Sequence, residues 1–280
     1  MNNFFKYAYT AIAGISLLFI VSCKKNNLVL DMDVTAPAYA KFNTIAAADS
    51  IGTYYIKSTN TPFVLPIGIT NVSKVDRNIQ FTYSSTAAVV GTQFNAPTSL
   101  VIKAGTAVDQ LTISGLFSGY PLSTRKDTVK ITISGGDVPA SSYKGVYRLI
   151  LRKYCDVSLA DLYGNYGAID NGTYGPYPMG VKAGSATSTG ATTGTLQVLN
   201  LWDYGIVTNT TVNLDWTDPA NFKVTIPDQV YVAGDGLWIK NSASTGTFSS
   251  CDQTFTLNYT LYFKASGASW YSNQVTKLKR

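Results

Sequence analysis

The decapeptide Thr254-Phe255-Thr256-Leu257-Asn258-Tyr259-Thr260-Leu261-Tyr262-Phe263 alternates polar and apolar side chains along most of its length. Successive side chains of a β-strand point to opposite faces of a sheet, so this period of two predicts a long strand. Thr, Tyr and Phe also suit a pleated, half-buried surface. Residues 23–280 keep a 3.6-residue apolar period nowhere for three turns. We therefore expect an all-β fold.

Upstream of this strand, residues 30–153 contain seven short segments with the same alternation, separated by Gly, Pro, Asn or Asp. These segments are 54–57, 64–69, 79–83, 99–102, 110–114, 129–133 and 147–151. Seven strands at this spacing predict an immunoglobulin-like β-sandwich. Residues 156–162 fit a single helical turn capped by Asp156 or Ser158, and we place the domain boundary just before it, between 153 and 154.

Residues 154–280 have a different sequence pattern. Turn-rich stretches at 164–167, 171–178 and 184–193 come first. Alternating segments then follow at 194–198, 211–216, 222–226, 237–239, 245–249, 254–263 and 274–278. Consecutive hairpins of this kind predict a C-terminal antiparallel β-meander, either a lipocalin-like barrel or a curled sandwich.

The N-terminus has the layout of an export signal. Lys6 precedes an apolar run from Tyr7 to Val21, which is shorter than the roughly 20 residues that a membrane span needs. Ile20-Val21-Ser22-Cys23 resembles the lipobox of bacterial lipoproteins, in which the cysteine is acylated before the preceding bond is cut. We expect residues 1–22 to be a signal peptide, Cys23 to be lipidated and residues 23–29 to form a tether. The protein would then be lipid-anchored in the outer membrane.

The net charge of +6 comes from the two ends of the chain. It equals the contribution of six residues, which are Lys6, Lys24, Lys25, Lys277, Lys279 and Arg280. The body is therefore neutral and lacks the basic footprint of a nucleic-acid-binding protein. We expect the terminal lysines to be solvated, while those beside the lipid anchor can contact anionic head groups.

Histidine and glutamate are both absent from the sequence, so all 16 acidic residues are Asp. Without imidazole there is no Ser-His-Asp or Cys-His relay and no His-ligated zinc. Asp203, Asp215, Asp218, Asp228 and Asp235 could supply the two acids of a glycosidase, but turn chemistry explains most of them. We expect no enzyme, no cofactor and no metal site.

Once Cys23 is lipidated, Cys155 and Cys251 remain as an even pair in an oxidising compartment. We expect them to form a disulfide that joins the entrance of the second domain to its last hairpin. Two buried free thiols are the alternative.

Several short motifs carry a family resemblance: Tyr154-Cys155-Asp156-Val157, Leu162-Tyr163-Gly164-Asn165-Tyr166, Leu199-Asn200-Leu201-Trp202, Asp218-Pro219-Ala220-Asn221-Phe222 and Gly246-Thr247-Phe248-Ser249-Ser250-Cys251. With the final Tyr-rich strand, they resemble the C-terminal domain of uncharacterised Bacteroidetes lipoproteins, in which an Ig-like or Calx-β-like domain precedes it. The resemblance implies an accessory to an outer-membrane nutrient-uptake system of the starch-utilisation type. Surface-exported members carry acidic residues after the lipidated cysteine, whereas Lys24 and Lys25 stand here, so the periplasmic and cell-surface faces both stay open.

All four Trp residues fall in the second domain. Aromatic rings present a flat apolar face with a polar edge, which suits stacking against sugar rings as well as other binding interfaces. We expect Trp216 and Trp238, which lie in predicted strands, to fill the core. The candidate ligand-binding residues lie in loops and turns: Tyr174, Tyr177, Trp202, Trp270 and Tyr271. They predict glycan binding, and the competing hypothesis is a structural lipoprotein that docks a transporter or a neighbouring surface protein.

Two tripeptides, Asp49-Ser50-Ile51 and Asp127-Thr128-Val129, resemble the O-glycosylation sequon of Bacteroidetes secreted proteins. They mark Ser50 and Thr128 as candidate glycosylation sites. The alternative is a turn acid followed by the start of a strand.

Overall fold

The computed structural model describes residues 37–44, 51–59, 61–121, 123, 125–203 and 209–280. The predicted signal peptide 1–22, lipidation site Cys23 and tether, together with the candidate glycosylation site Ser50, lie outside the described residues. Within the described part, the regular elements are strands and three short 3-10 turns. The predicted all-β class is confirmed.

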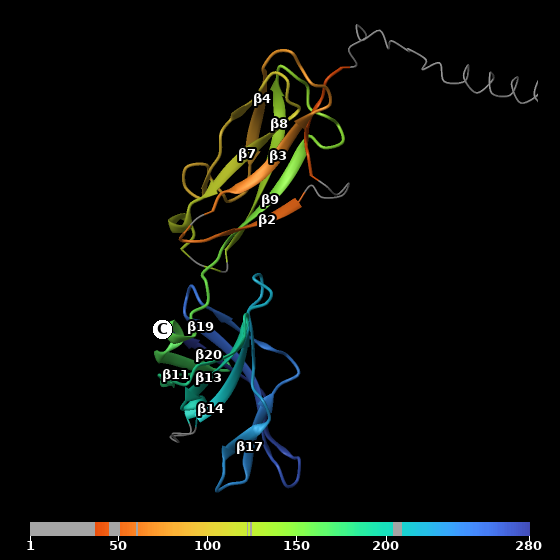
Figure 1. The fold of residues 1–280 in the computed structure, drawn as a ribbon. Helices are drawn as coiled ribbons and strands as arrows, with labels where there is room; N and C mark the ends of the chain where they lie inside the picture. The colour runs from red at the N-terminus through yellow and green to blue at the C-terminus, as the bar shows by residue number, and fades with distance from the viewer. Residues whose placement is uncertain (1–36, 45–50, 60, 122, 124, 204–208) are drawn as a thin grey trace, which may run out of the picture.

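Two sheets form a β-sandwich in the N-terminal half (Figure 1). One has the order β1-β3-β7-β5, and the other has the order β2-β9-β8-β4-β6. Their bounds are β1 Ala40–Phe42, β2 Ile51–Ile56, β3 Phe63–Ile69, β4 Arg77–Ser84, β5 Phe94–Asn95, β6 Ser99–Ile102, β7 Val108–Gly115, β8 Lys126–Gly136 and β9 Val146–Lys153. All pairs are antiparallel except β2–β9.

Both sheets contribute side chains to one hydrophobic core. Ile67 and Ile113 come from the first sheet, and Ile131 and Leu149 from the second. These side chains are fully buried because alternate residues of each strand face the opposite sheet. All seven segments predicted for this half are strands, so the expected sandwich is confirmed.

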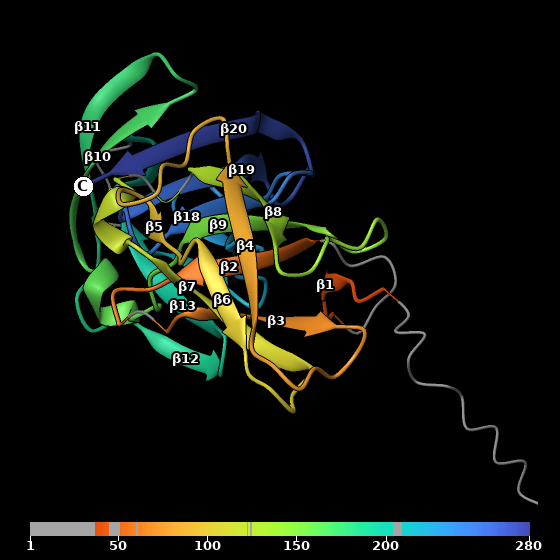
Figure 2. The same cartoon turned by 90° about the horizontal axis from the view of Figure 1, so that it is seen from above.

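Eight strands of the C-terminal half pair antiparallel in a closed ring. In ring order they are β10 Gly164–Asp170, β11 Tyr174–Val181, β13 Thr193–Leu199, β14 Asn209–Asp215, β15 Lys223–Thr225, β18 Gly246–Ser249, β19 Thr254–Phe263 and β20 Ser269–Lys279. β20 closes the ring because it pairs with β19 on one side and β10 on the other (Figure 2). Of the two predicted alternatives, the fold is the barrel.

Three further strands extend the barrel. β12, Thr187–Gly190, pairs with β13. β16, Gln229–Val232, and β17, Leu237–Asn241, form a hairpin on β19 and project away from the sandwich (Figure 1).

Strands β10 and β11 differ from the prediction, which is turns in these segments. Gly and Pro are depleted from strands, and both segments are rich in them. The inward positions nevertheless alternate, with Tyr166 and Ala168 on β10 and Tyr177 and Met179 on β11 all buried. Pairing with β13 and β20 in the closed ring therefore overrides the local preference for turns.

The predicted helical turn is a 3-10 turn at Leu159–Leu162. Ser158 stands at its N-cap position but makes no side-chain cap hydrogen bond, while Asp156 pairs with Lys57 at 2.6 Å. Among the described residues, no helix combines the length and apolar character needed to cross a bilayer.

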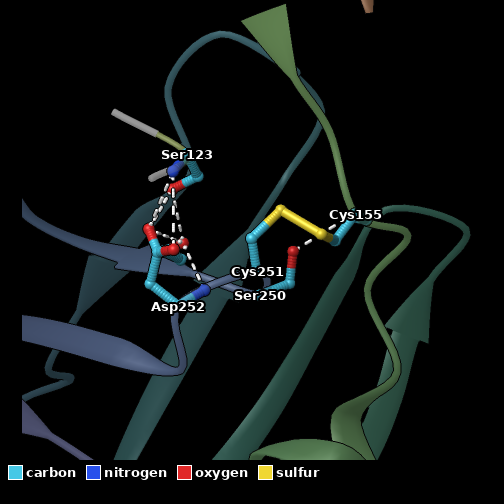
Figure 3. Close-up of a disulfide and its surroundings, with 6 residues drawn as sticks. Ser123, Cys155, Ser250, Cys251 and Asp252 are labelled. Atoms are coloured by element: carbon cyan, nitrogen blue, oxygen red, sulfur yellow. Dashed lines mark hydrogen bonds between the residues drawn. A yellow bond between two sulfur atoms is a disulfide. The ribbon is translucent and has the colours of Figure 1, made fainter. Parts of the chain in front are cut away.

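The predicted disulfide between Cys155 and Cys251 is present (Figure 3). It attaches the segment that follows β9 to the loop between β18 and β19. Beside it, Ser123 of the sandwich donates its backbone N–H to Asp252, and its hydroxyl contacts both Asp252 and Ser249. The disulfide thus closes a loop within the C-terminal half, and the hydrogen bonds of Ser123 connect the sandwich to that loop.

Candidate ligand-binding site

Three of the predicted aromatic residues form one cluster. The ring centroid of Trp202 lies 5.2 Å from that of Trp270 and 4.6 Å from that of Tyr271, and the last two are 5.0 Å apart. Phe263 extends the cluster at 6.3 Å from Trp270. Tilted and edge-to-face ring pairs at such distances contribute about 0.5–1.5 kcal/mol each beyond their buried area. We call Trp202, Phe263, Trp270 and Tyr271 the aromatic cluster.

The aromatic cluster is open to solvent. Trp270 is 37% exposed, Tyr271 40% and Phe263 38%, although large aromatic side chains usually bury most of their surface. Trp270 and Tyr271 are predicted to lie in a turn, but in the structure they belong to the first residues of strand β20. A register shift in the β19–β20 pairing occurs where Tyr262 pairs with Ser269 and Leu261 with Tyr271. Trp270 therefore occupies the irregular position, and bulges of this kind redirect a side chain.

The backbone of the segment that carries Trp202 is strained. Asn200, Trp202 and Asp203 all have positive φ, at 56°, 64° and 46°. The left-handed region costs a non-glycine residue about 1–2 kcal/mol. Such conformations persist where surrounding structure holds them, and they concentrate at ligand-binding sites.

Hydrogen bonds from neighbouring strands hold this segment. The backbone N–H of Trp202 donates to the Tyr177 hydroxyl at 3.0 Å, and the Asn200 side chain donates to the carbonyl of Pro178 at 2.8 Å. The Tyr231 hydroxyl donates to the carbonyl of Leu201. Trp202 is therefore fixed from the barrel wall.

A buried carboxylate lies beneath this contact. Asp170 of β10 accepts hydrogen bonds from the hydroxyls of Tyr177, at 3.0 Å, and Thr276. Tyr259 lies 2.9 Å from the Thr276 hydroxyl, and because that hydroxyl donates to Asp170, Tyr259 is the donor to it. Burial raises the pKa of Asp170, and the hydrogen bonds from Thr276 and Tyr177 offset part of the rise. Two hydrogen-bond chains, from Trp202 and from Tyr259, thus converge on one carboxylate.

Tyr174 and Asp203 supply polar groups beside the rings. The hydroxyl of Tyr174 donates to Asp203 at 2.9 Å, and this hydrogen bond raises the pKa of Tyr174. The Tyr174 side chain is 58% exposed, and its ring centroid lies 5.9 Å from that of Tyr177. An exposed carboxylate therefore lies next to open aromatic faces.

Tyr177 has a different place from the one we expected. It lies in β11, as does Tyr174, and only 5% of its surface is exposed. Its hydroxyl is committed to Asp170 and Trp202. Tyr177 therefore supports the aromatic cluster from below rather than facing a ligand.

The other residues singled out in the sequence lie apart from the cluster. Trp216 packs against the barrel core as expected, whereas Trp238 of β17 faces away from it and lies under the Lys264 ammonium at 4.2 Å. Asp215 and Asp218 each accept a backbone N–H two residues ahead, in keeping with turn roles, and Asp228 pairs with Lys264 at 2.9 Å. Thr128 is exposed on β8.

Four residues that support the aromatic cluster are not among the predicted site residues: Asp170, Tyr231, Tyr259 and Thr276. Asp170 precedes Asn171-Gly172, which is a turn signal. Its role as the last, inward-facing residue of strand β10 was therefore not predicted. Within the described residues, no group of three or more Cys or Asp side chains lies close enough to hold a metal ion.

No protein-family model matches the chain, and no curated protein matches it. Among solved structures, the chain is similar to a protein of unknown function from Bacteroides ovatus, with 10% identity and a TM-score of 0.35 over 87% of this chain and 94% of that one. It is also similar to an auxiliary nutrient binding protein from Bacteroides thetaiotaomicron, with 14% identity and a TM-score of 0.32 over 85% and 92%. A third similarity is to CBD12 from CALX1.2, with 10% identity and a TM-score of 0.34 over 71% and 82%.

Proposed function

We propose that the protein is a non-catalytic glycan-binding protein and that the aromatic cluster, with Tyr174 and Asp203, is its binding site. The supporting observation is the exposed contact among Trp202, Trp270 and Tyr271 at one end of the barrel. Trp and Tyr give a large contact area at a small cost in side-chain entropy, and they dominate binding energy where they cluster.

The polar groups beside the aromatic cluster favour a neutral sugar as the ligand. Asp203 and the Tyr174 hydroxyl lie on one side of the cluster, where they can bond the hydroxyls of a neutral sugar. The carbon-bound hydrogens of the same sugar then stack on the rings. The strained backbone at Trp202 and Asp203 is held by Tyr177 and Asn200, so the site needs little reorganisation on binding.

Affinity electrophoresis in gels that contain neutral polysaccharides tests this site. We expect retardation of the wild-type protein by at least one polysaccharide, and a loss of affinity of about tenfold or more for Trp270→Ala. Trp238→Ala is the matched control, because Trp238 also lies on the barrel but outside the cluster. Absence of retardation by every polysaccharide, or an equal loss in Trp238→Ala, would contradict the proposal.

The second part of the proposal concerns where the protein acts. We propose that Cys23 is acylated and holds the protein in the outer membrane, as an accessory to a nutrient-uptake system. The support is the Ile20-Val21-Ser22-Cys23 sequence after an apolar leader. Labelled palmitate should enter the wild-type protein and not Cys23→Ala, and the wild-type protein should fractionate with outer membranes. An unlabelled wild-type protein would refute the anchor and leave the glycan test unaffected.

A further inference from the structure

A second feature lies at the other end of the barrel. Between the segment that follows β9 and the strands β18 and β19 there is a pocket of about 390 Å³. Strand β19 has 10 residues and runs from this pocket to the aromatic cluster, which places the two about 30 Å apart. A ligand in the pocket is therefore independent of the proposed glycan site.

The walls of the pocket combine aromatic rings with hydroxyl groups. Tyr154 and Phe222 meet edge-on with ring centroids 5.9 Å apart and form one wall. Thr247, Thr254 and Thr256 form the floor, and within the described part of the chain their hydroxyls make no hydrogen bond to other protein groups. Those three hydroxyls are available to a polar ligand.

The pocket also carries positive charge. Arg152 and Lys153 line it, and no carboxylate does. The guanidinium of Arg152 donates to the carbonyl of Ala220 at 3.2 Å, which fixes its position at the rim. The nearby carboxylates are already engaged, since Asp156 pairs with Lys57 and Asp252 accepts hydrogen bonds from Ser123 and Ser249.

The register of the barrel extends this charge beyond the pocket. Thr247 lies opposite Lys223 on β15, and Thr256 lies opposite Lys277 on β20. In the next row, Thr254 lies opposite Lys279. Directly opposed residues share one face of a sheet, and all three lysines are exposed, so they surround the threonines on the outer face. Lys223 and Lys277 are three strands apart, a span of about 14 Å.

Within the described residues, the paired rows that contain these threonines and lysines include one carboxylate, that of Asp215, which lies opposite Lys223. The face therefore keeps a strong positive excess. Its floor carries threonine hydroxyls rather than aliphatic side chains, which does not suit insertion into a lipid surface. Two lysines that the sequence placed in a solvated tail, Lys277 and Lys279, belong to this structured face.

We propose that this cationic face, made of Arg152, Lys153, Lys223, Lys277 and Lys279 around the threonine floor, binds an acidic polysaccharide. The lysines and Arg152 would pair with carboxylate or sulfate groups spaced along the polymer. The threonine hydroxyls would bond sugar hydroxyls, and the Tyr154–Phe222 wall would stack against a sugar ring.

Binding of dextran sulfate, with uncharged dextran as the matched polymer, tests the proposal, and polygalacturonate distinguishes carboxylate from sulfate as the recognised group. We expect wild-type protein to bind at least one of the two acidic polymers and to bind neither at high salt, because exposed charges are screened. The triple variant Lys223→Gln/Lys277→Gln/Lys279→Gln should lose about tenfold or more in affinity. Arg152→Gln, which removes the positive charge at the rim, should also lose affinity.

The control removes the same charge elsewhere. Lys74, Lys126 and Lys182 are exposed lysines outside this face, and changing all three to Gln should leave binding unchanged. Equal losses in the two triple variants would overturn the proposal, as would wild-type protein that binds neither acidic polymer or binds phosphatidylglycerol vesicles instead. Trp270→Ala should keep full affinity for the acidic polymer, which separates failure here from failure of the neutral-glycan site.

Discussion

The Tyr177 hydroxyl accepts the backbone N–H of Trp202 at 3.0 Å, and this contact connects the barrel core to the exposed aromatic cluster. Tyr177 is buried, whereas Trp202 sits at the edge of solvent in a left-handed backbone conformation. The same hydroxyl donates to Asp170, so it is oriented with its lone pair toward Trp202. The position of a surface ring therefore depends on a buried carboxylate.

Tyr177→Phe removes this link and leaves the ring in the core. We expect a loss of about 1–3 kcal/mol in the free energy of unfolding, because Asp170 loses a donor and the Trp202 N–H loses its acceptor. Affinity for the neutral glycan should fall as well, since Trp202 is no longer fixed. Urea unfolding and glycan titration measure the two effects.

Tyr166→Phe is the matched control for this prediction. The buried Tyr166 hydroxyl donates to the carbonyl of Leu162 at 2.7 Å and touches nothing in the aromatic cluster. This variant should lose stability and keep glycan affinity. If both variants keep glycan affinity, Tyr177 has no part in positioning Trp202.

Asp170 predicts a dependence of stability on pH. Burial raises its pKa in the folded protein above the ordinary value of 3.8, so the folded state binds a proton more readily than the unfolded state. The stability that this group contributes is then fully present below its unfolded pKa and is lost as pH rises through the folded pKa. As pH falls from about 7 to about 4, the unfolding free energy of the wild-type protein should rise relative to Asp170→Asn. Urea unfolding at each pH measures this difference, and a constant difference would contradict it.

The sequence predicted strands well where apolar and polar residues alternate. The decapeptide 254–263 is strand β19, and Leu257 and Tyr259, which face inward, are fully buried. Strands β10 and β11 escaped prediction because Gly164, Gly175 and Pro176 are turn residues by local preference. Their strand conformation comes from pairing across the closed barrel, which no local pattern contains.

The candidate site was predicted in its residue types and only partly in its geometry. Trp270, Tyr271 and Trp202 were recognised as aromatic residues of the second domain, and they meet in space. Residues 202 and 270 are far apart in sequence, so only the ring order of the strands brings them together. The support from Tyr177 could not be predicted either, because it depends on the burial of Asp170.

The disulfide predicts a large change in stability on reduction. Cys155 and Cys251 are 96 residues apart in the chain, and closing a loop of that size restricts the unfolded state by about 4–5 kcal/mol on the entropy model. Cys155→Ser/Cys251→Ser should therefore unfold at a lower urea concentration than the oxidised wild-type protein. Adding reductant should lower the stability of the wild-type protein to that of the double variant and leave the variant unchanged. If reductant also lowers the stability of the double variant, its effect on the wild-type protein has a cause other than this disulfide.

An ion pair between a half-buried arginine and a buried aspartate of the sandwich gives the last prediction. The guanidinium of Arg125 lies 2.9 Å from the carboxylate of Asp127, whose side chain is only 3% exposed. Arg125→Ala leaves this charge buried without its partner, and we expect a loss of about 3 kcal/mol in unfolding free energy. Lys126→Ala removes a charge from the adjacent, exposed position and should cost less than about 0.5 kcal/mol. Urea unfolding of the two variants measures the contrast, and equal costs would show that Asp127 is stabilised by groups other than Arg125.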